Sequence, residues 1–125
     1  MKELIKYRLN KSKETLKDAK ILFDKGSLFS SVNRLYYAVF YSVTALLLKN
    51  GNSSAKHSGI MALFNVHFIK TGIIPKEYGR FYSRLFEFRQ KGDYIDFVEF
   101  ERPKVRDWLK QAVKFIKIIE KVIGK

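Results

Sequence analysis

The chain has 125 residues, with 25 lysines and arginines against 12 acidic residues, and it contains no cysteine. This length indicates one domain spanning residues 1–125, and the absence of cysteine excludes disulfides and thiolate sites. With only two histidines, His57 and His67, a structural zinc site is not expected, and we expect neither a metal nor a cofactor. No signal peptide or membrane-spanning run is visible, so we expect a cytoplasmic protein without a membrane partner.

The formal net charge of +13 favours an acidic or polyanionic partner. The alternative is a lysine-rich surface of the kind found in many thermophilic proteins, where lysines serve solubility and ion pairing. Charge alone leaves both interpretations open.

The first predicted helix spans residues 2–25, and Gly26 ends it. The connection to the next helix is short, so the two should be antiparallel neighbours. The predicted buried stripe repeats at helical spacing and contains Ile5, Leu9, Ser12, Leu16, Ala19 and Phe23.

The second predicted helix, residues 27–50, is apolar on nearly every side and has no charge between Leu35 and Leu48. Such a helix must be covered on nearly every side, so we place it at the centre of the fold. Its start is predicted at Ser27, whose hydroxyl can accept a backbone N–H of the first turn. Asn50 and Gly51 are predicted to end it.

The third predicted helix covers about residues 56–70, capped by Ser53 or Ser54 and ended by Gly72. The fourth starts at Pro75 and should stop at Gly92.

Residues 93–100 alternate apolar and acidic side chains, but a lone strand would have no partner, so we interpret them as an irregular segment. Pro103 then opens a last helix that runs to about Val122. The sum is an all-α, up-and-down bundle of about five helices. Its wide apolar surfaces also predict a homodimer, through the central or the fourth helix.

Arg89 is the first candidate site residue, because it shares a helical row with Tyr78, Tyr82 and Leu85. A guanidinium on a buried side must be paired, and Asp93 is the nearest candidate in the sequence. One interpretation is a structural clamp between these two residues, with Tyr94 packed on it. The other is a phosphate-binding arginine, whose planar fork suits phosphate oxygens.

Lys56 and His57 form the second candidate, in the first turn of the third helix, where anions are attracted. His57 could be an acid or base near neutral pH or a core residue, while His67 is assigned to the core. The third candidate is a row of lysines along one face of the last helix, interpreted as either a solvated face or a docking surface for RNA or an acidic protein. This row contains Lys110, Lys114, Lys117 and Lys121.

Four segments together resemble the HEPN domain family (higher eukaryotes and prokaryotes nucleotide-binding), and most closely its stand-alone prokaryotic branch. The segments are Asn33-Arg34-Leu35-Tyr36-Tyr37-Ala38-Val39-Phe40-Tyr41, Lys56-His57, Phe68-Ile69-Lys70-Thr71-Gly72 and Arg89-Gln90-Lys91-Gly92-Asp93-Tyr94. The resemblance implies a helical bundle that dimerises and gathers polar residues in a cleft between the subunits. It also implies, for many members, ribonuclease activity and a toxin role beside a nucleotidyltransferase partner.

The ribonuclease members have an arginine, a polar residue and then a histidine after a gap of four to six residues. Arg89 matches the arginine and Gln90 the polar residue, but Tyr94, Ile95 and Asp96 stand where the histidine is expected. Tyrosine titrates near pH 10 and is a poor substitute near neutral pH. His57 could replace the histidine only if the fold brings it to Arg89.

The leading hypothesis is therefore a module that binds a nucleotide or an RNA phosphate and acts with a nucleotidyltransferase, as part of a toxin–antitoxin pair. One alternative is a metal-independent endoribonuclease toxin, with Arg89 and His57 as catalytic residues and Tyr94 as a second candidate for the histidine's place. Another is a helical scaffold without catalysis. The predicted binding residues are Arg34, Tyr37, Lys56, His57, Arg89, Asp93 and Tyr94.

Overall fold

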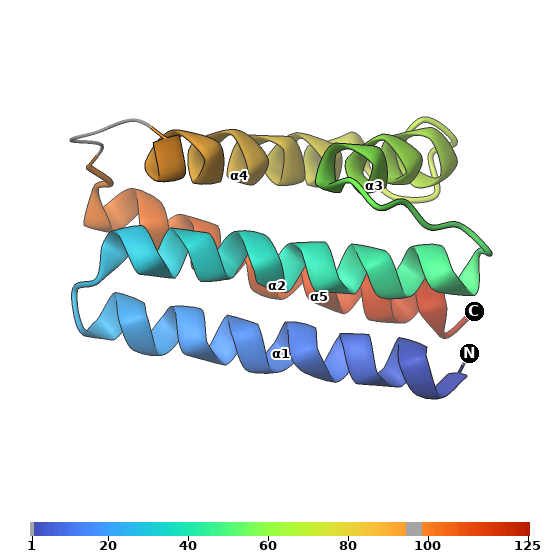
Figure 1. Cartoon of the computed structure of the whole chain (residues 1–125), viewed down its shortest axis with the longest axis horizontal. Coiled ribbons are helices and arrows are strands. Elements are labelled where there is room, and N and C mark those ends of the chain that lie inside the picture. The colour runs from blue at the N-terminus through green and yellow to red at the C-terminus, as the bar shows by residue number, and fades with distance from the viewer. Residues whose placement is uncertain (1, 95–98) are drawn as a thin grey trace.

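The computed structural model describes residues 2–94 and 99–125, and in these ranges the chain forms helices and no strand (Figure 1). The elements are α1 (Lys2–Asp24), α2 (Leu28–Lys49), α3 (His57–Phe64), the π-helical η1 (Asn65–Ile69), α4 (Lys76–Tyr94) and α5 (Arg102–Ile123). This confirms the predicted all-α bundle. None of the helices described is long and apolar enough to span a membrane.

Helices α1 and α2 form an antiparallel hairpin, as their short connection predicts (Figure 1). Gly26 turns the chain with a φ of 81°, a conformation that costs glycine little. Two buried serines join the helices: Ser12 Oγ donates to the carbonyl of Ala38 at 2.5 Å, and Ser31 Oγ to that of Ala19 at 2.7 Å. Both alanines are fully buried, so small side chains allow the helices to pack closely.

Helix α2 is central, between α1 on one side and α3 with α4 on the other, while α5 runs along both α1 and α2 (Figure 1). Its apolar rows are covered within one chain; Leu35, Val39, Val43 and Leu47 are completely buried. The face that remains half-buried contains Arg34, Tyr37 and Tyr41. The chain thus leaves polar and aromatic residues, rather than aliphatic ones, on the partly open side of its central helix.

One predicted helix boundary, the stop at Gly92, was wrong, and two other helices differ from the prediction in detail although their bounds agree with it. The Ser27 side chain makes no capping bond; its backbone carbonyl instead accepts the N–H of Ser31 at 2.9 Å. The third helix is not uniform, since it widens into η1, which packs onto Gly79 of α4, where a Cβ would lie 3.1 Å from Ile69. Gly92 does not end α4, which continues to Tyr94, because a glycine permits a helix end without requiring one.

At the entry to α3, Lys56 occupies the N-cap position and no side chain caps the helix. The Ser54 hydroxyl instead accepts the backbone N–H of Lys56 at 3.2 Å. The last helix starts as predicted, with Pro103 in its first turn. Of the predicted irregular segment, Glu99 and Phe100 lack regular structure, Asp93 and Tyr94 are helical, and residues 95–98 are outside the described ranges.

Candidate functional site

Arg89 of α4 points toward α2, where its Nη2 donates a hydrogen bond to the hydroxyl of Tyr37 at 3.0 Å. The centre of the guanidinium lies 5.3 Å from the ring centroids of both Tyr36 and Tyr37. The side chain is half-buried. Arg89 is therefore fixed against an aromatic wall in which each ring face attracts its positive charge.

His57, the first residue of α3, contacts the same wall from another helix. Its Nδ1 lies 3.0 Å from the hydroxyl of Tyr36, and its ring stacks on Phe40 with centroids 4.1 Å apart. Burial lowers the pKa of His57 below its usual 6.5, and the positive charge of Arg89 lowers that pKa further. The imidazole is consequently neutral at pH 7.

Tyr36 and Tyr37 connect the two candidate residues. Their rings meet edge to face at 5.2 Å, with Tyr36 bonded to His57 and Tyr37 to Arg89. Burial raises the pKa of Tyr36, opposed by the charge of Arg89, so its hydroxyl stays protonated. The fold thus brings His57 into electrostatic range of Arg89, which the sequence spacing could not establish.

Arg34 extends the positive surface along α2. Its guanidinium lies 5.0 Å from the Tyr37 ring, and its Nε and Nη2 donate to Asn33 Oδ1 at 3.3 Å and 2.9 Å. Tyr37 is therefore contacted by two guanidinium groups. Lys56 is exposed next to His57, at the N-cap of α3.

The expected clamp between Arg89 and Asp93 stays a prediction. The backbones of Asp93 and Tyr94 belong to α4, but their side chains are outside the part of the chain that the structure describes. Ile95 and Asp96 are among residues 95–98, which are not described either.

Tyr36 and Phe40 are the site residues that sequence reasoning missed, because both fell on rows assigned to the core. Tyr36 is indeed fully buried. The available signal was its hydroxyl, since a buried tyrosine usually needs a hydrogen-bond partner. His57 is the partner that the fold provides. Among the side chains that the structure describes, no group of three or more His, Asp or Glu is arranged to hold a metal ion.

The family model for the HEPN domain matches residues 5–122. This chain belongs to the HEPN domain family. A UPF0332 protein of Thermotoga maritima is 50% identical over 121 residues, which cover 97% of this chain and 92% of that protein. "Putative toxin MJ0605" of Methanocaldococcus jannaschii is 32% identical over 125 residues, which cover 93% of each chain. "Putative toxin MJ0142" of the same organism is 28% identical over 115 residues, which cover 92% of this chain and 78% of that protein.

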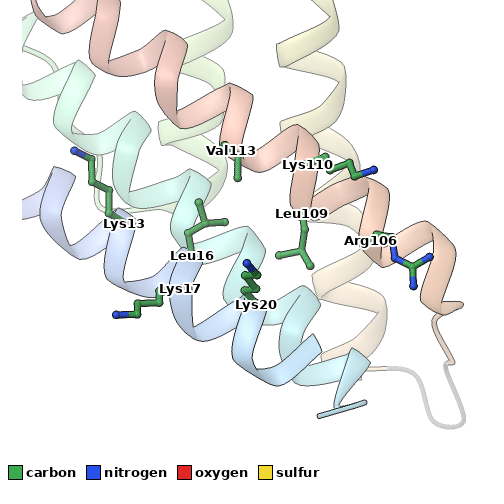
Figure 2. Close-up of a pocket in the computed structure, with 8 residues that line it drawn as sticks. All are labelled: Lys13, Leu16, Lys17, Lys20, Arg106, Leu109, Lys110 and Val113. Carbon is green, nitrogen blue, oxygen red and sulfur yellow. The ribbon is translucent and has the colours of Figure 1, made fainter. Parts of the chain in front are cut away.

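A separate groove of this HEPN domain lies between α1 and α5 and has a volume of about 490 Å³ (Figure 2). Leu16, Leu109 and Val113 provide its apolar lining. The cationic side chains around them are Lys13, Lys17, Lys20, Arg106 and Lys110. The groove shares no lining residue with the Arg89–His57 cluster and, of the lysine row on α5, contains only Lys110.

Proposed function

We propose that this HEPN domain binds RNA, or a nucleotide, through a phosphate held between Arg89 and His57. We further propose that it acts in the cytoplasm as the toxin of a toxin–antitoxin pair, as a homodimer with a nucleotidyltransferase as partner. The toxin role is supported by the names of the two M. jannaschii relatives. The +13 net charge supports a polyanionic ligand.

One observation is the main support for the phosphate site: Arg89 donates to the hydroxyl of Tyr37 at 3.0 Å, and the ring of Tyr37 lies 5.8 Å from that of His57. A guanidinium is suited to phosphate because its N–H groups match the phosphate oxygens in geometry and charge. Arg34, whose guanidinium lies 5.0 Å from the centroid of the Tyr37 ring, adds positive charge. A phosphate at this place would offset the positive charges of Arg34 on α2 and Arg89 on α4.

RNA cleavage is the second candidate function, and the lowered pKa of His57 favours it. A neutral imidazole can take the proton of a ribose 2′-hydroxyl, whose oxygen then attacks the adjacent phosphorus as the bond to the 5′ oxygen breaks. The leaving oxygen takes a proton from water, and Arg89 offsets the charge that develops on the phosphate. The products would be a 2′,3′-cyclic phosphate and a 5′-hydroxyl, without a metal.

The test of binding is the fluorescence anisotropy of a 3′-fluorescein-labelled 12-nucleotide RNA titrated with the protein and with Arg89→Lys. Lysine keeps the charge but loses the planar fork, so we expect at least a tenfold loss of affinity with an unchanged thermal melt. Full affinity in Arg89→Lys would reject the phosphate site. A different result, no binding of RNA by the unaltered protein even at low salt, would leave a scaffold role.

A double-mutant cycle separates binding from structural support. If Arg89 serves only to hold the fold, Arg89→Ala and Tyr37→Phe should each lower stability, and the double variant should cost about 1 kcal/mol less than their sum. The same cycle with Asp93→Ala tests the predicted clamp.

For cleavage, the RNA is incubated in EDTA with the protein or with His57→Asn, and products are resolved on a gel. Equal products from both would reject His57 as the catalytic base.

A further inference from the structure

A second cavity adjoins the Arg89–His57 cluster, where the first half of α1 faces the middle of α2 and the loop before α3. Its volume of about 410 Å³ is within the range of small-ligand sites, about 300–1,000 Å³. Tyr7, Arg8 and Lys11 of α1 line one side, and Phe40 and Tyr41 of α2 line another. None of these α1 residues belongs to a motif singled out in the sequence.

The cavity is positively charged. Arg8 and Lys11 line it, and none of the described lining residues is acidic. In the described part of the chain neither cation is paired with a carboxylate, and Arg8 is half-buried. Uncompensated positive charge on a concave surface attracts an anion, because the charge is less screened there than on an open surface.

Aromatic rings form much of the same lining. The ammonium of Lys11 lies 4.9 Å from the ring centroid of Tyr41 and 6.0 Å from that of Tyr7, so it sits over both rings. The Tyr7 side chain is 60% exposed. Tyrosine faces are platforms on which nucleobases stack, and a flexible lysine stem lets the ammonium follow a phosphate.

Hydrogen-bonding groups complete the lining at the loop before α3. The hydroxyl of Ser54 accepts a bond from Lys56 N–H, which leaves its own proton available to a ligand. The amide of Asn52 and the hydroxyl of Ser53 line the cavity beside it. An aromatic platform, two neighbouring cations and neutral hydrogen-bonding groups together match a nucleotide better than they match an apolar ligand or a bare anion.

The cavity and the proposed phosphate site share a wall. Phe40 lines the cavity and also stacks on His57 at 4.1 Å. Tyr41 of the cavity lies 5.9 Å from Tyr37, the residue bonded to Arg89. The cavity therefore adjoins the proposed phosphate site through the rings of Phe40 and Tyr41.

We propose that this cavity binds one nucleoside of a single-stranded RNA, with the base stacked on Tyr7 and Tyr41 and a phosphate held by Arg8 and Lys11. This inference rests on the proposed phosphate site and extends it by one nucleotide. A second copy of the chain is the less suitable occupant, because a surface with the same excess of positive charge would meet Arg8 and Lys11. An acidic peptide would satisfy the charge but leave the tyrosine faces without a stacking partner.

The test compares a fluorescein-labelled hexauridylate with an abasic hexamer that has the same ribose-phosphate backbone, both by anisotropy. The protein should bind the RNA at least tenfold more tightly than the abasic strand, and Tyr7→Ala should reduce this preference several-fold. Arg8→Gln combined with Lys11→Gln should weaken both strands by at least tenfold. The matched control is Lys17→Gln with Lys20→Gln, which removes the same charge from α1 at the other groove and should change affinity less than threefold.

Three results would overturn this inference: equal affinity for both strands, equal effects of the cavity pair and the control pair, or a Tyr7→Ala variant that becomes monomeric but keeps its base preference. The last result would assign the cavity to an interface between copies.

Arg89→Lys separates this inference from the proposed function. If Arg89→Lys loses binding while the cavity variants do not, the phosphate site stands and the cavity proposal fails. If Arg89→Lys binds normally while Tyr7→Ala loses base preference, the cavity binds nucleotides and the phosphate site fails.

Discussion

The hydroxyl of Tyr36 lies 3.0 Å from Nδ1 of His57, joining the centre of α2 to the first residue of α3. Tyr36 is fully buried and His57 half-buried. The bond therefore satisfies a buried hydroxyl and also sets the orientation of the imidazole relative to Arg89. Tyr82 offers a contrast, because its hydroxyl is also buried but has no hydrogen-bond partner among the described residues.

Removing each hydroxyl in turn tests this relationship. Tyr36→Phe should lower the free energy of unfolding by about 1 kcal/mol, the usual net value of a hydrogen bond. Tyr82→Phe should leave stability unchanged or raise it, because it removes a buried polar group that has no partner. Thermal melts and chemical denaturation measure both. A Tyr82→Phe variant as destabilised as Tyr36→Phe would show that the loss of a buried hydroxyl, and not the loss of the bond to His57, is the cause.

The pKa of His57 should lie below 6.5, since burial and the charge of Arg89 both disfavour the imidazolium. The unfolded chain then binds more protons than the folded chain in this pH range, so stability falls as the pH drops below about 6.5 and through the folded pKa. NMR titration of the His57 ring protons measures the pKa directly. The control is Arg89→Gln, which should raise this pKa. An unchanged pKa would show that the charge of Arg89 does not act on His57.

The helices were predictable from the sequence because their signals are local. The apolar rows of α2, the positive-φ turn at Gly26 and the proline at the start of α5 all act within a few residues. Gly92 was misjudged because glycine only permits a helix end, and helix formation through Tyr94 prevailed.

The site was less predictable because its contacts are not local. Tyr37 and Arg89 are 52 positions apart, and Tyr36 and His57 are 21 apart. Periodicity could place Arg89 on an inward row, but it could not name the tyrosine opposite. Periodicity also assigned Tyr36 and Phe40 to the core. Only their contacts in the folded chain show that they line the site.

The dimer stays a prediction, with a changed physical basis. One chain already covers the aliphatic rows of α2, so the central helix does not need a second copy to bury it. The remaining exposed large apolar side chains include Leu4 and Tyr7 of α1, which line one cavity, and Phe29 of α2. If Phe29 of α2, which is 42% exposed, lies at the interface, light scattering at micromolar concentration should give twice the chain mass, and Phe29→Glu should give the monomer mass. A monomer at every concentration would reject the dimer.

The lysine row on α5 is exposed along its whole length, which is compatible with either a solvated face or an RNA surface. If the row contacts RNA, the logarithm of the affinity should fall linearly with the logarithm of the salt concentration, because each phosphate contact releases counterions. Each lysine lost from such a contact should reduce the slope by about 0.7 for single-stranded RNA. The variant replaces four residues with glutamine: Lys110, Lys114, Lys117 and Lys121.

The matched control removes the same charge from α1, where four lysines are equally exposed and none lines the cavity proposed to bind a nucleoside. These are Lys2, Lys6, Lys17 and Lys20. If α5 is an RNA surface, the α5 variant should flatten the salt dependence while the α1 variant leaves it nearly unchanged. Equal flattening by both would mean that RNA responds to the overall +13 charge and not to one helix face. No flattening by the α5 variant would leave its lysines as a solvated face and restrict RNA contact to other residues, with Arg89 the first to test.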